Sequence, residues 1–396
     1  MKRKIICIVG GGPAGLMAAD ILSRNHEVLL FDKEKNIGQK FLVAGKGGFN
    51  LTNSLLGKEL CSKYTPAGFL DNALMEFDTL AFRQWLSELG ISTFVGTSGR
   101  VFPEKNISPN QVLNKIKTRL LAQGVKFFTQ YRFISVDPHQ RITFRHKEQE
   151  IIFDTDFIVF ALGGASWPQT GSDGSWINVF QAMEIIVNPF QASNCGINIH
   201  WPESLKQSHA GKPLKNIRLF TDNHEVKGEA MITQYGLEGN AVYQLVPAIR
   251  EMINAKKSAR IFIDFKPFNT EHQLLEKVKD QEILTKDYGR IFSLTTAQLA
   301  VIKTFTTKEE YLSVPTFIQC LKKLKIPVAS LRPVGEAIST IGGVSVRELN
   351  EDFSLKKYPW IYTIGEMVDW DAPTGGFLIQ GSVSMANYAA QSILKR

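Results

Sequence analysis

A glycine-rich segment near the N-terminus constrains the fold of this chain more than any other feature. The apolar run 5–9 has the composition of a buried parallel strand and precedes GGGPAG at 10–15, after which residues 16–22 have a helical pattern. A second apolar run, 28–31, ends in Asp32, about 20 residues beyond the middle of the motif. Strand, glycines, helix, strand and acid in this order predict a Rossmann-type dinucleotide site.

Each residue type in this segment has a separate predicted role. Gly10 permits a tight turn, Gly12 lets the backbone approach a pyrophosphate, and Gly15 lets the helix lie close to the strand. The helix N-terminus favours the anionic phosphates, and Asp32 is placed to accept ribose hydroxyls. The cofactor-binding residues predicted here are Gly10, Gly12, Pro13, Ala14, Gly15, Asp32 and Lys33.

Length and composition narrow the class of protein. A chain of 396 residues with 44% hydrophobic residues is large enough for two or three globular domains. The N-terminal apolar run is too short for a signal peptide, and no run approaches the ~18 apolar residues of a membrane span. We therefore expect a cytoplasmic protein with no membrane partner. Four scattered cysteines and seven scattered histidines form no metal-ligand pattern, so no metal site is predicted.

A second glycine-rich stretch, 38–53, follows the dinucleotide motif. Bare backbone at its glycines can lie along a flat ligand, while neighbouring polar side chains meet the carbonyls and phosphates of that ligand. The cofactor-binding residues predicted in this stretch are Lys40, Gly45, Lys46, Gly47, Asn50 and Thr52.

Several motifs together resemble those of one bacterial flavoprotein family. These motifs are 44–53 (AGKGGFNLTN), 99–103 (GRVFP), 163–167 (GGASW) and the segment beginning at Gly365-Glu366. The family includes aminoacetone oxidase, a proposed bile-acid reductase and a ribosomal RNA dihydrouridine synthase. Many members have Arg-Cys where this chain has Gly48-Phe49, so chemistry that depends on that cysteine is not implied here.

The resemblance implies an α/β fold of the glutathione-reductase type, with a Rossmann-like FAD domain built from both chain ends. The implied domains are 1–189 and 335–396 for FAD, with an insert at 190–334. The apolar strand 157–160 and the strand 360–364 would each end in glycines at the cofactor, and a last helix at about 382–394 would point its N-terminus toward the flavin C2 carbonyl. The cofactor-binding residues implied here are Ala161, Gly163, Gly164, Gly365, Glu366, Gly375, Gly376, Phe377, Ile379 and Gln380.

The insert changes character along its length. Short alternating segments such as 196–201 and 259–265 predict a β-rich part at 190–268, expected as a β-barrel, and 270–286 and 307–324 predict helices in the part 269–334. The insert contains no second GxGxxG, so NADPH or NADH, if used, must bind transiently beside the flavin. Elsewhere the sequence predicts amphipathic helices at 69–94 and 108–121 and a hairpin at 130–137 and 140–145.

The positive charge of the chain leaves two interpretations of its surface open. The formal net charge is +8, and basic residues gather at 206–227 and again at 322–325. Acidic residues are interleaved with the first group, so a solvated face is one interpretation and an RNA-binding groove is the other.

The preferred interpretation is an FAD-dependent oxidoreductase, since a second glycine-acid strand and a terminal helix suit a long cofactor. The leading reaction is NAD(P)H-linked reduction of an electron-poor C=C bond in a small molecule, by hydride transfer through flavin N5. The alternatives are an RNA uridine reductase, an oxidase of a small amine or amino-ketone, and a flavin-loaded sensor. The catalytic candidates are Arg100, Trp167 and Cys195, with Tyr235 as a further proton donor. The sequence leaves the substrate, the electron donor and the oligomeric state open.

Overall fold

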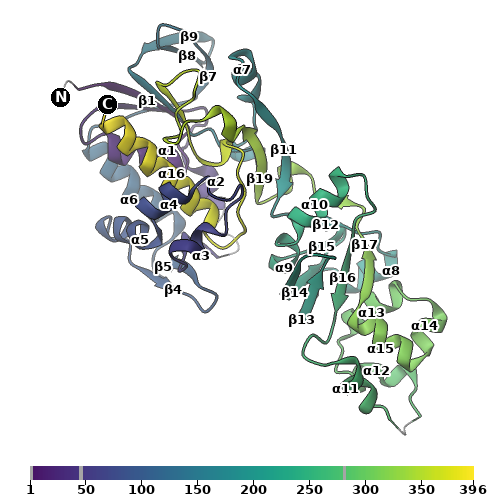
Figure 1. Ribbon diagram of the computed structural model, residues 1–396. Coiled ribbons are helices and arrows are strands. Elements are labelled where there is room, and N and C mark those ends of the chain that lie inside the picture. Colours follow the sequence, from purple (N-terminus) through teal and green to yellow (C-terminus); the bar gives the residue numbers. More distant parts are fainter. Residues whose placement is uncertain (1–2, 44–47, 280–281) are drawn as a thin grey trace. The chain divides into compact units, whose positions relative to one another are not determined.

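The chain forms two compact units in a computed structural model that describes residues 3–43, 48–279 and 282–396 (Figure 1). Unit 1 consists of Met1–Gln191 and Ile338–Arg396, and unit 2 consists of Ala192–Ala337. The insert that was expected at 190–334 therefore corresponds to unit 2, whose ends lie two or three residues further along the chain.

A five-stranded sheet forms the centre of unit 1. Every neighbouring pair in it is parallel, and β1 lies between β2 and β10. Strands β1, β2, β10 and β20 are largely buried, since they consist mostly of apolar residues, whereas the edge strand β6 is partly exposed. In spatial order the strands are β20 (Ile361–Thr363), β10 (Phe157–Phe160), β1 (Ile5–Val9), β2 (Glu27–Asp32) and β6 (Lys126–Thr129).

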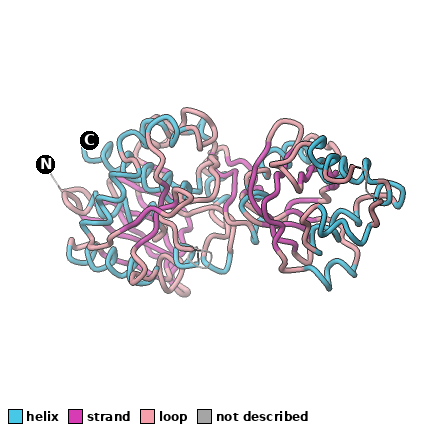
Figure 2. Tube along the Cα trace, turned by 90° about the horizontal axis from the view of Figure 1, so that it is seen from below, coloured by secondary structure: helices cyan, strands magenta, loops and turns pink. Residues whose placement is uncertain are grey.

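Two helices from opposite ends of the chain pack against each other in unit 1. These helices are α1 (Pro13–Leu22) and α16 (Phe377–Leu394), and both contribute to one apolar core with the sheet. Figure 2 shows the strands of this unit, in magenta, enclosed by helices, in cyan. The last helix begins at Phe377, earlier than the expected start near 382, because Gly376 in the left-handed region (φ 98°) starts it and its first turn is apolar. Within the described ranges, no helix is long and apolar enough to cross a membrane.

The segment predicted as one helix over 69–94 is two helices and a strand. Asp78 accepts hydrogen bonds from the Leu80 and Ala81 N–H groups, so it caps a new helix and ends the previous one. The predicted helix at 108–121 is confirmed, with a Ser108–Gln111 capping box. The elements in this part of unit 1 are α2 (Gln39–Val43), β3 (Thr52–Asn53), α3 (Gly57–Cys61), α4 (Asp71–Glu76), α5 (Thr79–Glu88), β4 (Thr93–Val95), β5 (Arg100–Pro103) and α6 (Pro109–Ala122).

The predicted hairpin is confirmed and carries a third strand. An antiparallel meander is formed by β7 (Tyr131–Val136), β8 (Arg141–His146) and β9 (Gln149–Asp154). Sequence analysis missed β9, whose residues are mostly exposed or partly exposed and lack a strong apolar alternation. The remaining α-helix of this unit is α7 (Ile177–Ala182). Strand β11 (Val187–Ser193), whose last two residues belong to unit 2, pairs with β19 (Ser339–Val344).

Unit 2 contains a sheet that curves back on itself. Its two edge strands, β17 and β18, are separated only by Val328 and Ala329, which donate backbone hydrogen bonds to Ala259 and Asn198. One short stretch of chain thus joins both edges, as in the expected barrel. In spatial order the strands are β17 (Leu324–Pro327), β16 (Arg260–Asp264), β13 (Pro213–Phe220), β14 (Glu225–Ile232), β15 (Gly236–Glu238), β12 (Ile197–Asn198) and β18 (Ser330–Leu331).

The helical part of unit 2 is more divided than predicted. The segment 307–324 is two helices, because Ser313 ends the first and Pro315 lies in the first turn of the second. Among the described residues of the segment 270–286, only Glu271–Glu276 form an α-helix, and a short 3-10 helix begins at Thr285. A helix over 296–304 was missed despite its Thr295–Gln298 capping box. The helices of this unit are α8 (Glu203–His209), α9 (Asn240–Tyr243), α10 (Val246–Asn254), α11 (Glu271–Glu276), α12 (Tyr288–Ile291), α13 (Thr296–Thr304), α14 (Lys308–Leu312) and α15 (Val314–Lys322).

Candidate functional site

The loop between β1 and α1 is shaped by three glycines with different surroundings. A Cβ on Gly10 would lie 2.2 Å from the Ala161 carbonyl oxygen, and one on Gly15 would lie 1.9 Å from the Gly10 carbonyl oxygen. Both positions therefore need glycine for close backbone packing. Around Gly12, by contrast, a Cβ would meet none of the described atoms within 4 Å, and no described side chain caps the helix that starts at Pro13. This open, uncapped helix start has the features of an anion-binding site.

Asp32 fixes the same loop from the end of β2. One carboxylate oxygen accepts the Gly11 N–H at 2.8 Å and the other accepts the Glu34 N–H at 2.8 Å. Burial raises the pKa of Asp32, and these two N–H bonds partly offset that effect. Each oxygen retains a lone pair for a further donor, so the carboxylate can still accept a ribose hydroxyl. Lys33 forms an ion pair with Asp173 at 2.6 Å.

The start of α16 is held by the short strand β3. Asn53 donates to the Gly375 carbonyl at 3.2 Å, and the Asn50 side-chain amide faces the Gly48 carbonyl and the Gly376 N–H. A Cβ on Gly376 would lie 2.3 Å from the Thr52 backbone, so β3 and the glycine turn are in direct contact. The two chain ends thus meet at the N-terminus of a long helix.

Thr52 and Gln380 pair with each other beneath that turn. Both are buried, and the Thr52 hydroxyl donates to Gln380 Oε1 at 2.6 Å. The Gln380 amide also donates to the Phe77 carbonyl and to Ser384. These two predicted cofactor-binding side chains therefore use their polar groups inside the protein, where they position the turn.

Arg100 lies beside the same turn. It pairs with Asn53 in the register between β3 and β5, and its Nε is 3.6 Å from the Cβ position of Gly375. Within the described ranges, no carboxylate pairs with its guanidinium. A partly exposed cation beside a helix N-terminus can stabilise negative charge on a bound ligand.

Lys40 and Glu366 connect two further segments near β10, the loop that contains Ser166 and the strand β19. The Lys40 ammonium lies 2.5 Å from the Glu366 carboxylate and 2.7 Å from the Ser166 hydroxyl. The other oxygen of Glu366 accepts the Thr340 N–H at 3.0 Å. A Cβ on Gly164 would lie 2.0 Å from Thr340 Oγ1, so the glycine allows β19 to approach this loop.

Trp167 follows in the same loop with a left-handed backbone (φ 57°), unusual for a bulky residue and typical of constrained functional loops. Gly163 also has a positive φ, and its carbonyl accepts the Trp176 indole N–H at 3.1 Å. Thus Ala161, Gly163, Gly164 and Glu366 gather where β10 and β20 end.

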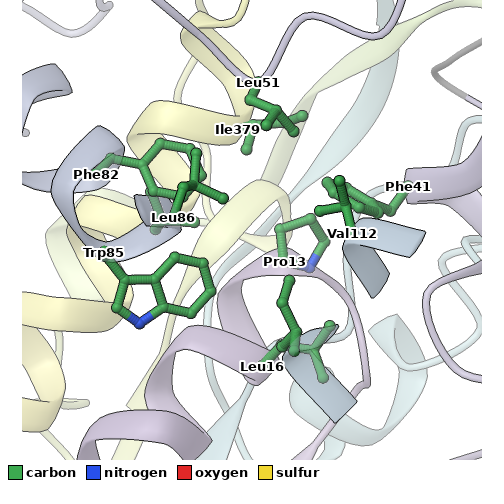
Figure 3. A pocket seen from close by; sticks show the side chains of 11 residues that line it. Pro13, Leu16, Phe41, Leu51, Phe82, Trp85, Leu86, Val112 and Ile379 are labelled. Carbon is green, nitrogen blue, oxygen red and sulfur yellow. The ribbon is translucent and has the colours of Figure 1, made fainter. Parts of the chain in front are cut away.

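A small apolar pocket lies between the two helix N-termini (Figure 3). Pro13 lines it from α1 and Ile379 from α16, and both were predicted as cofactor contacts. Its walls contain no charged side chain, so it is unsuited to phosphate groups. The lining residues are Pro13, Leu16, Phe41, Leu51, Phe82, Trp85, Leu86, Val112, Ile116, Ile379 and Val383.

Residues 4–392 match the model of the HI0933-like protein Rossmann domain family. The chain belongs to this family. The 3-dehydro-bile acid delta(4,6)-reductase of Clostridium scindens is 24% identical over 410 residues, which cover 99% of each chain. The ribosomal RNA dihydrouridine synthase of Escherichia coli is 24% identical over 408 residues, covering 100% of this chain and 99% of the relative. The family assignment makes the protein a flavoprotein of the FAD-dependent oxidoreductase class.

Solved structures of flavoenzymes share the fold of this family member. A 3-ketosteroid delta1-dehydrogenase from Sterolibacterium denitrificans superposes with a TM-score of 0.54, 11% identity and full coverage of both chains. A flavocytochrome c3 fumarate reductase gives 0.51 and 14% identity, covering 99% of this chain and 78% of the other. The open helix start at Gly12 and the turn at Gly376 fit an FAD held along its length.

The other catalytic candidates lie in unit 2. Cys195 is buried in a small cluster with Ala192, Val246 and Ala337. The Tyr235 hydroxyl donates a hydrogen bond to the Glu238 carboxylate. Burial, together with this hydrogen bond, raises the pKa of Tyr235. The predicted contacts Gly45, Lys46 and Gly47 lie outside the described residues.

Sequence analysis missed two partners of the predicted site residues in unit 1. Thr340 binds Glu366, and Tyr64 donates to the Phe377 carbonyl at 2.8 Å. The pair Gly342-Gly343 was a usable signal for β19, since a Cβ on either residue would lie within 2.4 Å of another backbone segment. Tyr64 gave no such signal, because an isolated tyrosine has no pattern.

Asp32 gives a prediction about pH. Because its pKa is raised, the carboxylate gains a proton at a higher pH than an ordinary aspartate, so FAD affinity should fall as the pH drops through that raised value. Asp32→Asn is expected to weaken FAD binding about tenfold at neutral pH and to flatten this dependence. Fluorescence titration of the apoprotein with FAD between about pH 5 and 8 measures both. An identical pH profile in the variant would count against the assigned role.

Proposed function

We propose that the protein is an NAD(P)H-linked reductase that saturates an electron-poor C=C bond in a small molecule. The observation that carries the proposal is the full-length similarity to a bile-acid delta(4,6)-reductase, in a chain whose site has a cation beside the start of α16. FAD, when bound, supplies hydride chemistry. The protein supplies position, charge and shielding from water.

Different residues of unit 1 would bind different parts of the cofactor. The uncapped start of α1 would hold the pyrophosphate, and Asp32 would accept the ribose hydroxyls. The start of α16 carries a partial positive charge, and Arg100 adds a full charge beside it. Both groups would therefore stabilise negative charge on a bound flavin.

A transiently bound nicotinamide is proposed as the electron donor, because unit 2 has no glycine fingerprint of its own. The test is anaerobic stopped-flow absorbance of the holoprotein mixed with NADPH or NADH, followed at the flavin band near ~450 nm. We expect fast bleaching by one of the two. If neither bleaches the flavin while a small amine supports peroxide production, the oxidase alternative replaces this proposal.

RNA is the second candidate substrate class. Ribosomal RNA dihydrouridine synthases of two bacteria align with nearly the whole chain, which favours a uridine C5=C6 bond as the acceptor. An enzyme of that kind must take its base out of the stack, so it requires RNA binding as well as flavin reduction. After reduction by the nicotinamide, reoxidation of the flavin by a small enone and not by RNA supports the small-molecule reductase, and the reverse result supports the RNA reductase.

A further inference from the structure

Trp167 differs from the other tryptophans of the chain in how its ring is used. Among the residues that the structure describes, its indole makes no hydrogen bond, ring contact or cation–π contact. It is partly exposed and does not pack on the apolar core of unit 1. The tryptophans that contact another ring or donate an indole hydrogen bond are Trp85, Trp176, Trp201, Trp360 and Trp370. Folding of the core therefore does not explain the indole at position 167.

The backbone holds this indole in a strained but fixed position. Trp167 has φ 57° and ψ 60°, a left-handed conformation that is uncommon for a bulky residue. On one side, Ser166 is fully buried and its hydroxyl accepts a hydrogen bond from the Lys40 ammonium at 2.7 Å. On the other side, the Trp167 carbonyl accepts the Thr170 N–H at 2.9 Å and the Thr170 hydroxyl at 2.7 Å. Strain of this kind persists where the surrounding contacts fix it, and it is typical of ligand-binding loops.

The loop that carries Trp167 contacts predicted cofactor residues on both sides of the indole. Before it, Ser166 binds Lys40, which forms an ion pair with Glu366. After it, Asp173 forms an ion pair with Lys33, the residue that follows Asp32 at the end of β2. Because Lys33 and Lys40 are already paired with carboxylates, they add little attraction for a further anion. The loop therefore offers a ligand at the cofactor site an aromatic ring rather than an unpaired charge.

We propose that Trp167 binds the nicotinamide electron donor by stacking on its nicotinamide ring. The inference rests on the proposed function, in which a nicotinamide dinucleotide reduces the flavin. Since unit 2 has no glycine fingerprint, the donor needs a binding surface elsewhere, and Trp167 lies beside the predicted cofactor residues of unit 1. An indole suits this ligand, because the nicotinamide ring is flat and becomes cationic once its hydride has been transferred. A non-aromatic, neutral enone would gain apolar contact alone.

The test is isothermal titration calorimetry of the FAD-loaded protein with NADP⁺ and with NAD⁺, which carry the nicotinamide ring but cannot reduce the flavin. Trp167→Leu keeps apolar bulk and removes the aromatic ring, so it should weaken binding of the preferred nucleotide about tenfold. Trp167→Phe restores a flat ring and should recover most of that affinity. Tryptophan fluorescence gives a second readout, because quenching by the bound nucleotide should disappear in Trp167→Leu.

The matched control is Trp360→Leu, which removes a partly exposed indole at the other edge of the parallel sheet, where β20 begins. It should alter nucleotide affinity by less than about twofold. The proposal is overturned if neither nucleotide binds the unmodified protein, if Trp167→Leu binds as tightly, if the control loses as much affinity, or if Trp167→Leu weakens FAD binding instead. The proposed function fails separately if NADPH and NADH leave the flavin oxidised although NADP⁺ or NAD⁺ binds through Trp167.

Discussion

Replacing Gly376 with alanine is expected to abolish stable FAD binding. Gly376 has a φ of 98°, and a Cβ there would lie 2.3 Å from the backbone of Thr52. The left-handed backbone alone costs about 1–3 kcal/mol for a residue with a side chain, and the clash with β3 adds to it. Relief requires movement of the start of α16 away from β3, which displaces the helix N-terminus that is predicted to face the flavin ring. We expect FAD affinity to fall by about a hundredfold or more.

Gly68→Ala is the matched control for Gly376→Ala. Gly68 also has a positive φ, 83°, but a Cβ there would meet no atom of the described ranges within 4 Å. It therefore carries the backbone strain without the clash. The cofactor content of each purified protein is measured from its absorbance spectrum, and the affinity from titration of the apoprotein with FAD. If Gly376→Ala keeps the FAD affinity of the Gly68→Ala control, the turn at α16 does not shape the cofactor site.

Replacing Asp20 with asparagine is expected to destabilise unit 1 strongly. Asp20 is fully buried in α1, where its carboxylate lies 2.7 Å from Arg119 Nε and accepts the Trp85 indole N–H at 2.9 Å. Arg24 also donates to it at 3.1 Å. Removing the buried negative charge leaves Arg119 without its closest counter-charge, which costs about 3 kcal/mol.

The loss is measured as a shift in the temperature at which FAD is released, because its fluorescence rises when unit 1 unfolds. For a unit of this size, the expected fall is about 6–10 °C. Glu150→Gln is the control, since Glu150 pairs with Arg145 at 2.9 Å but both side chains are more than half exposed. It should shift the transition by less than about 2 °C. Equal shifts in the two variants would show that the Asp20 cluster is not a buried stabilising network.

The sequence predicted best those parts of unit 1 in which local chemistry and global fold agree. The apolar runs at β1 and β10 have the continuous character of buried parallel strands, and the structure pairs them in parallel. Gly10 and Gly15 belong to a motif that requires close backbone contacts, and the structure contains these contacts. Such features are predictable because each depends on residues that are close in sequence.

The parts that could not be predicted depend on contacts between distant segments. Thr52 was expected to face the cofactor, but it pairs with Gln380, more than three hundred residues away. The partnership of Thr340 with Glu366 likewise appears only when β19 is placed beside β10. Neither the periodicity nor the spacing of residues in the sequence predicts such pairs, since they depend on tertiary packing.

The same limit applies to unit 2. Sequence analysis found the basic residues at 322–325 and left a solvated face or an RNA groove open. The register that sets Phe262 opposite both Phe220 and Lys325 follows from strand pairing across the sheet, so no local pattern could predict it.

A crystal structure of the protein with FAD bound tests most directly whether both ends of the chain hold one cofactor. We expect the pyrophosphate at the start of α1, a ribose hydroxyl on Asp32, and the flavin ring at the Gly375-Gly376 turn with Arg100 beside it. A flavin ring bound away from the start of α16, or an FAD held by unit 2, would contradict this account.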